Sequence, residues 1–223
     1  MLRSVPQDLY ASQGHRYDVK LSLFPQETAG LKLLTQLARQ LVLGTGTLSE
    51  LLGAPAADFD RLVEEMHQHE GESMNLHYAL LTHMRTSFIN TLPREDMFNL
   101  SRYLNDAMEK LDGAAELIGL YKLERLPTRA ADQLEIITRQ AELTVEAMRR
   151  LDDLDELEDY WIEVLRLAKR AERSHRVWVA DMLRDMKFAQ YTRHRDVANQ
   201  LVEVTKDMRR VATSVGAIIV KES

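Results

Sequence analysis

The sequence predicts an all-α protein with an elongated six-helix architecture, and three observations predict it. Apolar residues recur at alternating steps of three and four, which is the period of an amphipathic helix. Only 9 Gly and 5 Pro interrupt the 223 residues, which favours long helices. No stretch shows the alternation of apolar and polar residues that is typical of a strand. At 1.5 Å per residue, the longest helices would span roughly 45 Å.

The first half of the chain contains three predicted helices. The segment "GAP" at 53–55 ends the first, because proline cannot continue a helix. Asp58 or Asp60 is expected to cap the second. Pro93 is expected to precede the third, whose first turn carries two acids that suit the helix dipole. These helices are predicted over 27–53, 58–91 and 94–124.

The second half begins at Pro127 and repeats this order. The acidic run "DDLDELED" at 152–159 contains the turn into the fifth helix. The apolar pattern predicts helices over 128–152, from this turn to 186, and over 193–220.

A compact joint recurs once. "FINTLPREDM" at 88–97 has a weaker copy, "FAQYTRHRDV", at 188–197. We therefore expect a duplicated three-helix unit, with each joint forming the corner between its second and third helices. Short connections favour antiparallel neighbours in a bundle. The predicted organisation is a polar tail (1–20), a first three-helix bundle (21–126) and a second (127–223). A shift of 100 residues aligns Phe88 with Phe188, Asp96 with Asp196 and Tyr78 with Trp178.

The amino-acid composition excludes several kinds of function. The chain has no Cys, which excludes disulfides, thiol catalysis and thiolate metal sites and fits a reducing compartment. Its net charge of -6 argues against a nucleic-acid partner. The first residues lack the apolar run of a signal peptide, and no segment approaches the ~20 apolar residues that span a bilayer. A cytoplasmic protein is expected.

Four segments carry a resemblance to a known family. "SLFP" at 22–25, the joint at 88–97, "LNDAMEKLDGAAELIGLYKLERLP" at 104–127 and "VATSVGAIIVKES" at 211–223 resemble the Pit-accessory relatives of the phosphate regulator PhoU. The resemblance implies two tandem three-helix bundles of the PhoU-like kind. It also implies a regulator, not an enzyme, that contacts a low-affinity inorganic phosphate transporter, and a peripheral position at the inner membrane through that partner is among the options. The direction of regulation and the oligomeric state stay open, with a homo-oligomer among the options.

The resemblance also implies a metal site in the first bundle. PhoU binds iron or zinc clusters through acidic motifs, one set in each bundle. Carried onto this chain, the third-helix motif becomes an amide and an acid, whereas the second-helix pair keeps both acids. Weak or absent iron or zinc is therefore expected there. The residues concerned are Glu70, Glu72, Asn105 and Glu109.

In the second bundle, cations replace three of the four expected acids. Lys and Arg have no lone pair to offer a metal, so this bundle is not expected to hold a cluster. The cations Arg170, Lys206 and Arg210 could instead pair with Glu172, Glu203 and Asp207, or form an anion site if they converge.

Two alternatives stay open. Two Glu-x-x-His pairs, Glu64 with His67 and Glu172 with His175, are typical of ferritin-like di-iron enzymes, although no interior Glu is found on the first or third helix. The second alternative is a helical scaffold unrelated to transport.

Two polar segments are either metal faces or solvated helix faces. They are "HQHEGES" at 67–73 and the acidic stripe Asn105, Glu109, Asp112 and Glu116.

Overall fold

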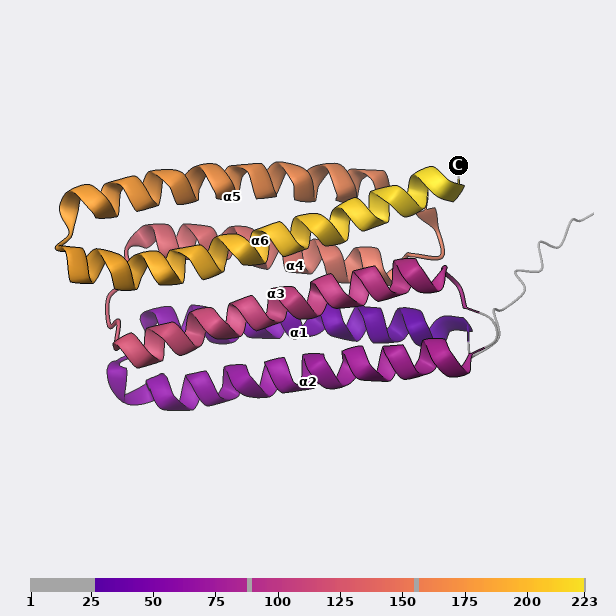
Figure 1. The fold of residues 1–223 in the computed structure, drawn as a ribbon, viewed down its shortest axis with the longest axis horizontal. Coiled ribbons are helices and arrows are strands. Elements are labelled where there is room, and N and C mark those ends of the chain that lie inside the picture. Colours follow the sequence, from indigo (N-terminus) through magenta and orange to yellow (C-terminus); the bar gives the residue numbers. More distant parts are fainter. Residues whose placement is uncertain (1–26, 88–89, 155–156, 223) are drawn as a thin grey trace, which may run out of the picture.

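The computed structural model describes residues 27–87, 90–154 and 157–222, so the predicted tail and the "SLFP" segment lie outside it. Within these ranges, six long helices and one 3-10 helix occur, without strands (Figure 1). The predicted all-α six-helix architecture is confirmed. None of the described helices combines the length and apolar character needed to cross a bilayer. The elements are α1 (Glu27–Gly53), η1 (Ala56–Asp58), α2 (Phe59–Thr86), α3 (Arg94–Tyr121), α4 (Thr128–Arg149), α5 (Leu157–Asp185) and α6 (Phe188–Glu222).

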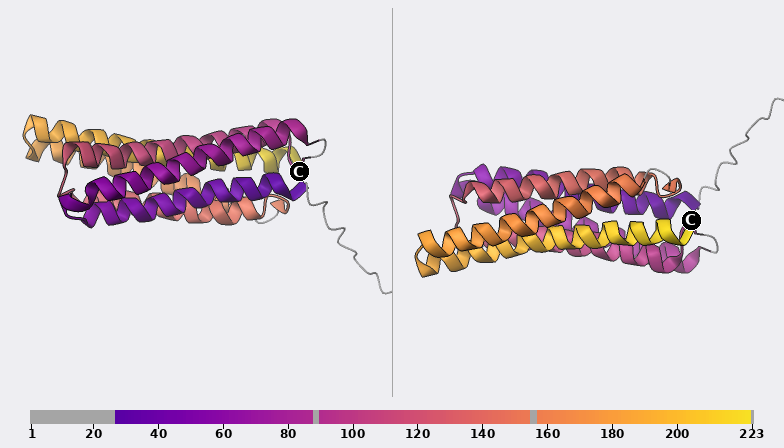
Figure 2. Two further views of the ribbon diagram at one scale, coloured as in Figure 1. Left: turned by 90° about the horizontal axis from the view of Figure 1, so that it is seen from below. Right: turned by 90° about the horizontal axis from the view of Figure 1, so that it is seen from above.

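The helices form one elongated body, in which successive helices run antiparallel (Figures 1 and 2). The unit α1–α3 lies beside the unit α4–α6 along its length. The two units meet where α1 packs on α4 and α3 packs on α6. One buried apolar cluster takes residues from all six helices, so the units share a core. The predicted division into two bundles at 21–126 and 127–223 stays a prediction.

The two units correspond residue by residue at their buried positions, although with two different shifts. Buried residues of α1 and α3 recur in α4 and α6 100 positions later, as Leu34 and Leu134 do. Buried residues of α2 recur in α5 only 98 positions later, so the counterpart of Trp178 is Leu80 and not Tyr78. The uniform shift expected from the sequence therefore misaligns these two helices. Other pairs at 98 positions are Phe59 and Leu157, Met66 and Val164, and Met84 and Met182.

Two contacts between α3 and α6 also correspond to each other when residue numbers are shifted by 100. Lys221 Nζ donates to Asp96 Oδ1 at 2.8 Å, where α6 ends beside the start of α3. Tyr121 Oη donates to Asp196 Oδ2 at 3.2 Å, where α3 ends near the start of α6. Because 96 and 196 correspond, as do 121 and 221, this seam has approximate two-fold symmetry.

The second joint differs from the prediction. The described part of the first joint contains a non-helical stretch from Asn90 to Pro93, after α2 has already ended at Thr86. In the second unit, only Met186 and Lys187 separate α5 from α6, and the whole of "FAQYTRHRDV" lies inside α6. The physical reason is proline: Pro93 disfavours helix in the residue before it, and 188–197 contains none. The corner between α5 and α6 consequently projects beyond the other unit (Figure 1).

The third helix ends at Tyr121, earlier than predicted, because a Schellman motif stops it. Lys122 adopts the left-handed conformation with φ of 50°. Its N–H donates to Gly119 O, and the N–H of Leu123 donates to Ile118 O. Lysine is unusual at this position, where glycine is the ordinary signal.

Buried polar side chains position α5 on α4. Gln140 Nε2 donates to the backbone oxygen of Val164 at 3.3 Å, and Gln133 Nε2 donates to that of Ala171 at 3.4 Å. Both glutamines are buried. Because a buried amide without a partner is costly, these bonds favour one register between the two helices.

Candidate functional site

The acidic face predicted for the first unit lies where α2 packs on α3. His67 Nδ1 is 2.7 Å from Asp112 Oδ1. Burial, and then the nearby charges of Asp112 and Glu109, raise the pKa of Glu70. Burial also raises the pKa of Asp112, and His67 opposes that shift. Three carboxyl groups and one imidazole therefore share this face.

The four residues predicted as metal ligands do not converge on one point. Glu70 lies near α3, but Glu72 is two positions later, about 200° around the helix, and is exposed. Asn105 Oδ1 accepts a hydrogen bond from Ser73 Oγ at 3.2 Å. Among the residues that the structure describes, no group of three or more His, Asp or Glu side chains is placed to hold a metal ion. Iron or zinc here stays a prediction.

The two histidines of the segment 67–73 contact different helices. His67 contacts Asp112 of α3, whereas His69 contacts Thr47 and Gln40 of α1 at 3.3 Å each. Since α1 and α3 lie on different sides of α2, the two imidazoles cannot share an ion.

Replacing Glu70 with glutamine should stabilise the protein at pH 7 by up to about 0.5 kcal/mol. The pKa of Glu70 is raised in the folded state, so the native protein retains a proton that the unfolded chain loses. Wild-type stability from this group is therefore highest at acidic pH and falls as the pH rises through the folded pKa. Glu70→Gln removes that fall. Urea unfolding at several pH values measures the difference.

Glu72→Gln is the matched control, because it removes the same charge from the exposed side of α2. It should change the pH dependence less. Equal effects of the two variants would contradict the assignment of a crowded acidic face to Glu70.

The charged cluster predicted for the second unit divides into two places. In a groove of about 660 Å³ between α5 and α6, Lys206 Nζ pairs with Glu203 at 2.5 Å. Arg209, and not Arg170, pairs there with Glu172 at 2.7 Å. His175 is half-buried and lies on the same groove, with Nε2 3.0 Å from Asn199 Oδ1. Each carboxylate of the groove thus has a cation.

The remaining pair lies on the seam with α3. Arg210 pairs with Asp207, whose side chain is buried, and the guanidinium of Arg210 lies 6.0 Å from the ring centre of Tyr103. Burial raises the pKa of Asp207, and Arg210 opposes that shift. Arg170 is exposed on α5. Lys206 and Arg210 thus pair with Glu203 and Asp207, as the salt-bridge alternative predicted, and the contacts described do not bring the three cations together. The 98-residue shift explains why Arg170 lies apart from the other two cations. Under this shift Arg170 corresponds to Glu72, which is also exposed.

The two Glu-x-x-His pairs are also separate. One lies on α2 and the other on α5, at opposite edges of the molecule (Figure 1). His67 faces α3, and Glu172 is engaged by Arg209. A shared di-iron site is not formed by these pairs.

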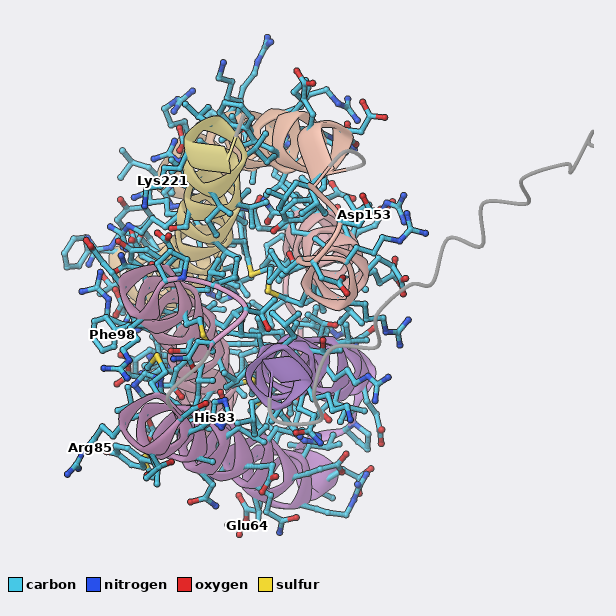
Figure 3. The ribbon with its side chains drawn as sticks, turned by 90° about the vertical axis from the view of Figure 1, so that its right-hand side faces the viewer. Glu64, His83, Arg85, Phe98, Asp153 and Lys221 are labelled. Atoms are coloured by element: carbon cyan, nitrogen blue, oxygen red, sulfur yellow. The ribbon has the colours of Figure 1, made fainter. Side chains whose placement is uncertain are left out.

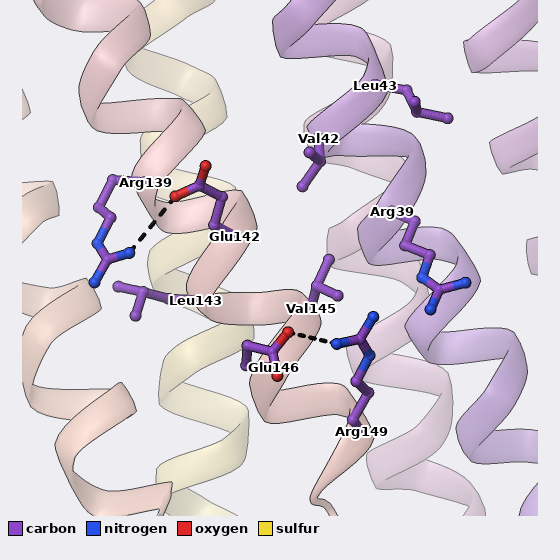
Figure 4. Close-up of a pocket in the computed structure, with 9 residues that line it drawn as sticks. All are labelled: Arg39, Val42, Leu43, Arg139, Glu142, Leu143, Val145, Glu146 and Arg149. Carbon is purple, nitrogen blue, oxygen red and sulfur yellow. Dashed lines mark hydrogen bonds and ion pairs between the residues drawn. The ribbon is translucent and has the colours of Figure 1, made fainter.

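A shallow apolar groove of about 400 Å³ follows the seam between α1 and α4 (Figure 4). Val42, Leu143 and Val145 line it. Two ion pairs within α4 border it, Arg139 with Glu142 at 3.5 Å and Arg149 with Glu146 at 2.5 Å. Arg39 of α1 also lines the groove, so apolar contact is combined there with a cation, without a nucleophile beside a base.

An exposed aromatic surface occupies the outer side of α2 and α3. Tyr78 is 57% exposed and Phe98 is 38% exposed. Arg102 lies over the ring of Tyr103 at 4.6 Å and over that of Phe98 at 5.8 Å. Figure 3 shows Phe98 at the outside of the bundle. We call the set Met74, His77, Tyr78, Phe98, Arg102 and Tyr103 the aromatic surface.

His77 belongs to the aromatic surface and also contacts the buried Ser101 of α3. Its Nδ1 is 3.1 Å from Ser101 Oγ, and its ring centre is 6.3 Å from that of Phe98. Burial lowers the pKa of His77, so the imidazole is neutral at pH 7. Arginine, tyrosine, phenylalanine and methionine are enriched where proteins bind one another.

Sequence analysis missed the aromatic surface and Arg209. Phe98 and Arg102 stand four apart on one helix, which is a visible signal. The shift of 100 residues aligned Tyr78 with the core residue Trp178. The approach of α2 side chains to Phe98 of α3 could not be predicted from either helix alone.

The fold and these sites define an all-α protein whose described surface offers grooves and contact faces. No family model matches the chain, and no curated protein matches it.

Proposed function

We propose that this protein is a regulatory accessory protein of inorganic phosphate transport, which acts by binding a low-affinity phosphate transporter. The resemblance of four segments to Pit-accessory proteins supports the proposal. The order of two three-helix units, with corresponding buried positions, agrees with what that resemblance implies.

The aromatic surface is the proposed contact face, and it is the observation that carries the proposal. It flanks the first joint, which is one of the segments that carry the resemblance, because Phe98 and Arg102 stand in the first turns of α3 and Tyr78 stands on α2. Aromatic and arginine side chains dominate the binding energy of many interfaces. Tyr78 is largely exposed in the isolated chain, so a partner can cover it.

The test is retrieval of a phosphate transporter with the tagged full-length chain from its own cells. Wild-type protein should retrieve the transporter, and deletion of the gene should change phosphate uptake. The double variant Tyr78→Ala, Phe98→Ala should reduce retrieval at least tenfold, because loss of hot-spot residues costs about 2 kcal/mol or more each.

The control is Leu43→Ala, Leu120→Ala, which removes two exposed apolar side chains from other surfaces. It should retrieve the transporter as wild type does. Failure of wild-type protein to retrieve any phosphate transporter would favour the scaffold. A tightly held iron pair with oxygen reactivity in the purified protein would favour the enzyme.

A further inference from the structure

The outer face of α5 carries a stripe of cations. Residues 164–180 contain five cations and a single acid, Glu172. Since Arg209 of α6 engages Glu172, this acid does not neutralise the stripe. Arg166 pairs with Glu163, but the other four cations have no ion pair within the described part of the chain. These four, the basic stripe, are Lys169, Arg170, Arg173 and Arg176, and all are exposed. Arg176 stands at the border of this face, because it also lines the groove between α5 and α6.

Apolar side chains share this face. Ile162 is 55% exposed and Val177 is 42% exposed. At 100° per residue, both lie within about 60° of Arg173 around the helix. The buried residues Val164, Ala171 and Trp178 lie on the opposite side. The outer face of α5 thus combines cations with exposed apolar groups.

The excess of positive charge is confined to the middle of α5. Over its whole length α5 carries six cations and six acids, so the basic stripe is a local feature of a chain with a net charge of -6. α5 lies at an edge of the body, packed on α4 and α6, and its outer side is uncovered (Figures 1 and 2). Along the helix axis the basic stripe spans roughly 10 Å, and the outer face from Ile162 to Val177 spans roughly 22 Å.

We propose that the outer face of α5 docks on the surface of an anionic lipid bilayer. Basic side chains near an anionic surface contribute about 1 kcal/mol each, and exposed apolar groups beside them enter the headgroup region. A flat bilayer can lie against α5 alone, because α5 is at an edge of the body. A polynucleotide long enough to wrap the body would also meet the rest of a chain whose net charge is -6, which disfavours it. This face is separate from the aromatic surface, so the inference stands without the proposed function.

Sedimentation with lipid vesicles tests the proposal. The full chain should bind phosphatidylcholine vesicles that contain phosphatidylglycerol, and bind pure phosphatidylcholine vesicles far less. The triple variant Lys169→Gln, Arg170→Gln, Arg173→Gln should weaken binding to the anionic vesicles on the order of a hundredfold. Added salt should weaken wild-type binding.

The matched control is Lys32→Gln, Arg39→Gln, Arg85→Gln, which removes one lysine and two arginines from α1 and α2. It should bind as wild type does. Equal loss in both triple variants would overturn the proposal, because net charge alone would then explain binding. So would equal binding to the two kinds of vesicle.

A second measurement locates the contact. The chain has no cysteine, so Val177→Cys offers one site for an environment-sensitive fluorophore. Its emission should shift to the blue with anionic vesicles. A label at Leu43→Cys on α1, which is also exposed, should not shift. A shift at Leu43 without one at Val177 would place the bilayer elsewhere and overturn the proposal.

Discussion

Replacing Trp178 with alanine should lower the free energy of unfolding by about 3–5 kcal/mol, as expected for a large aromatic side chain removed from a packed core. Trp178 is 1% exposed and belongs to the core that both units share. Its indole N–H has no hydrogen-bond partner within the described residues. Trp178→Phe keeps most of the volume and removes that donor, so its loss should be less than about 1.5 kcal/mol. Urea unfolding followed by circular dichroism measures both.

Tyr78→Ala is the informative control, because a shift of 100 residues pairs Tyr78 with Trp178 in the sequence. Tyr78 is exposed, so its removal should change stability by no more than about 0.5 kcal/mol. Losses of similar size at the two positions would contradict the 98-residue correspondence of α2 with α5. A small loss at Tyr78 would also mean that reduced transporter retrieval reflects binding and not unfolding.

The second large effect is expected at Gly216 of α6, where valine should destabilise the protein by about 1–3 kcal/mol. A Cβ at this position would lie 2.5 Å from Cε2 and 2.6 Å from Cδ2 of Trp161. These atoms belong to the fused part of the indole, so the whole ring of Trp161 would have to move. The thermal midpoint and urea unfolding measure the loss.

Gly46→Ala is the matched control, since a Cβ there meets no atom within 4 Å. Alanine has the higher helix propensity, so this change within α1 should stabilise the protein by about 0.5–1 kcal/mol. Opposite signs at Gly216 and Gly46 would identify the contact with Trp161 as the cause. A stabilising Gly216→Val would show that α5 and α6 do not approach as closely as described.

The sequence predicted helix ends well where a proline lies next to them, whereas the side chain of Asp58, at the expected N-cap of α2, makes no capping hydrogen bond. α1 ends at Gly53, as the following Ala54-Pro55 requires, and α4 begins just after Pro127. It failed at Lys122, because a lysine in the left-handed conformation gives no signal in the sequence. It also failed at 188–197, where the likeness to the first joint hid the absence of a proline.

The candidate sites were harder to predict, because each depends on two helices. The sequence grouped Glu70 with Glu72, but the helical period turns them apart, and Asp112 of α3 takes part instead. It paired Arg170 with Glu172, whereas Arg209 approaches from α6. The basic stripe had a readable spacing along one helix, yet its exposure depends on what α4 and α6 leave uncovered.

By itself, the sequence determined the helical class and the number and order of the helices, because the period of apolar residues and the positions of proline act over a few residues. It also suggested the duplication. Only the tertiary structure decided the register between the halves, the two different shifts and the pairing of charges across α5 and α6. Those depend on which helix faces meet, and a local pattern contains no information about the neighbour that a side chain will contact.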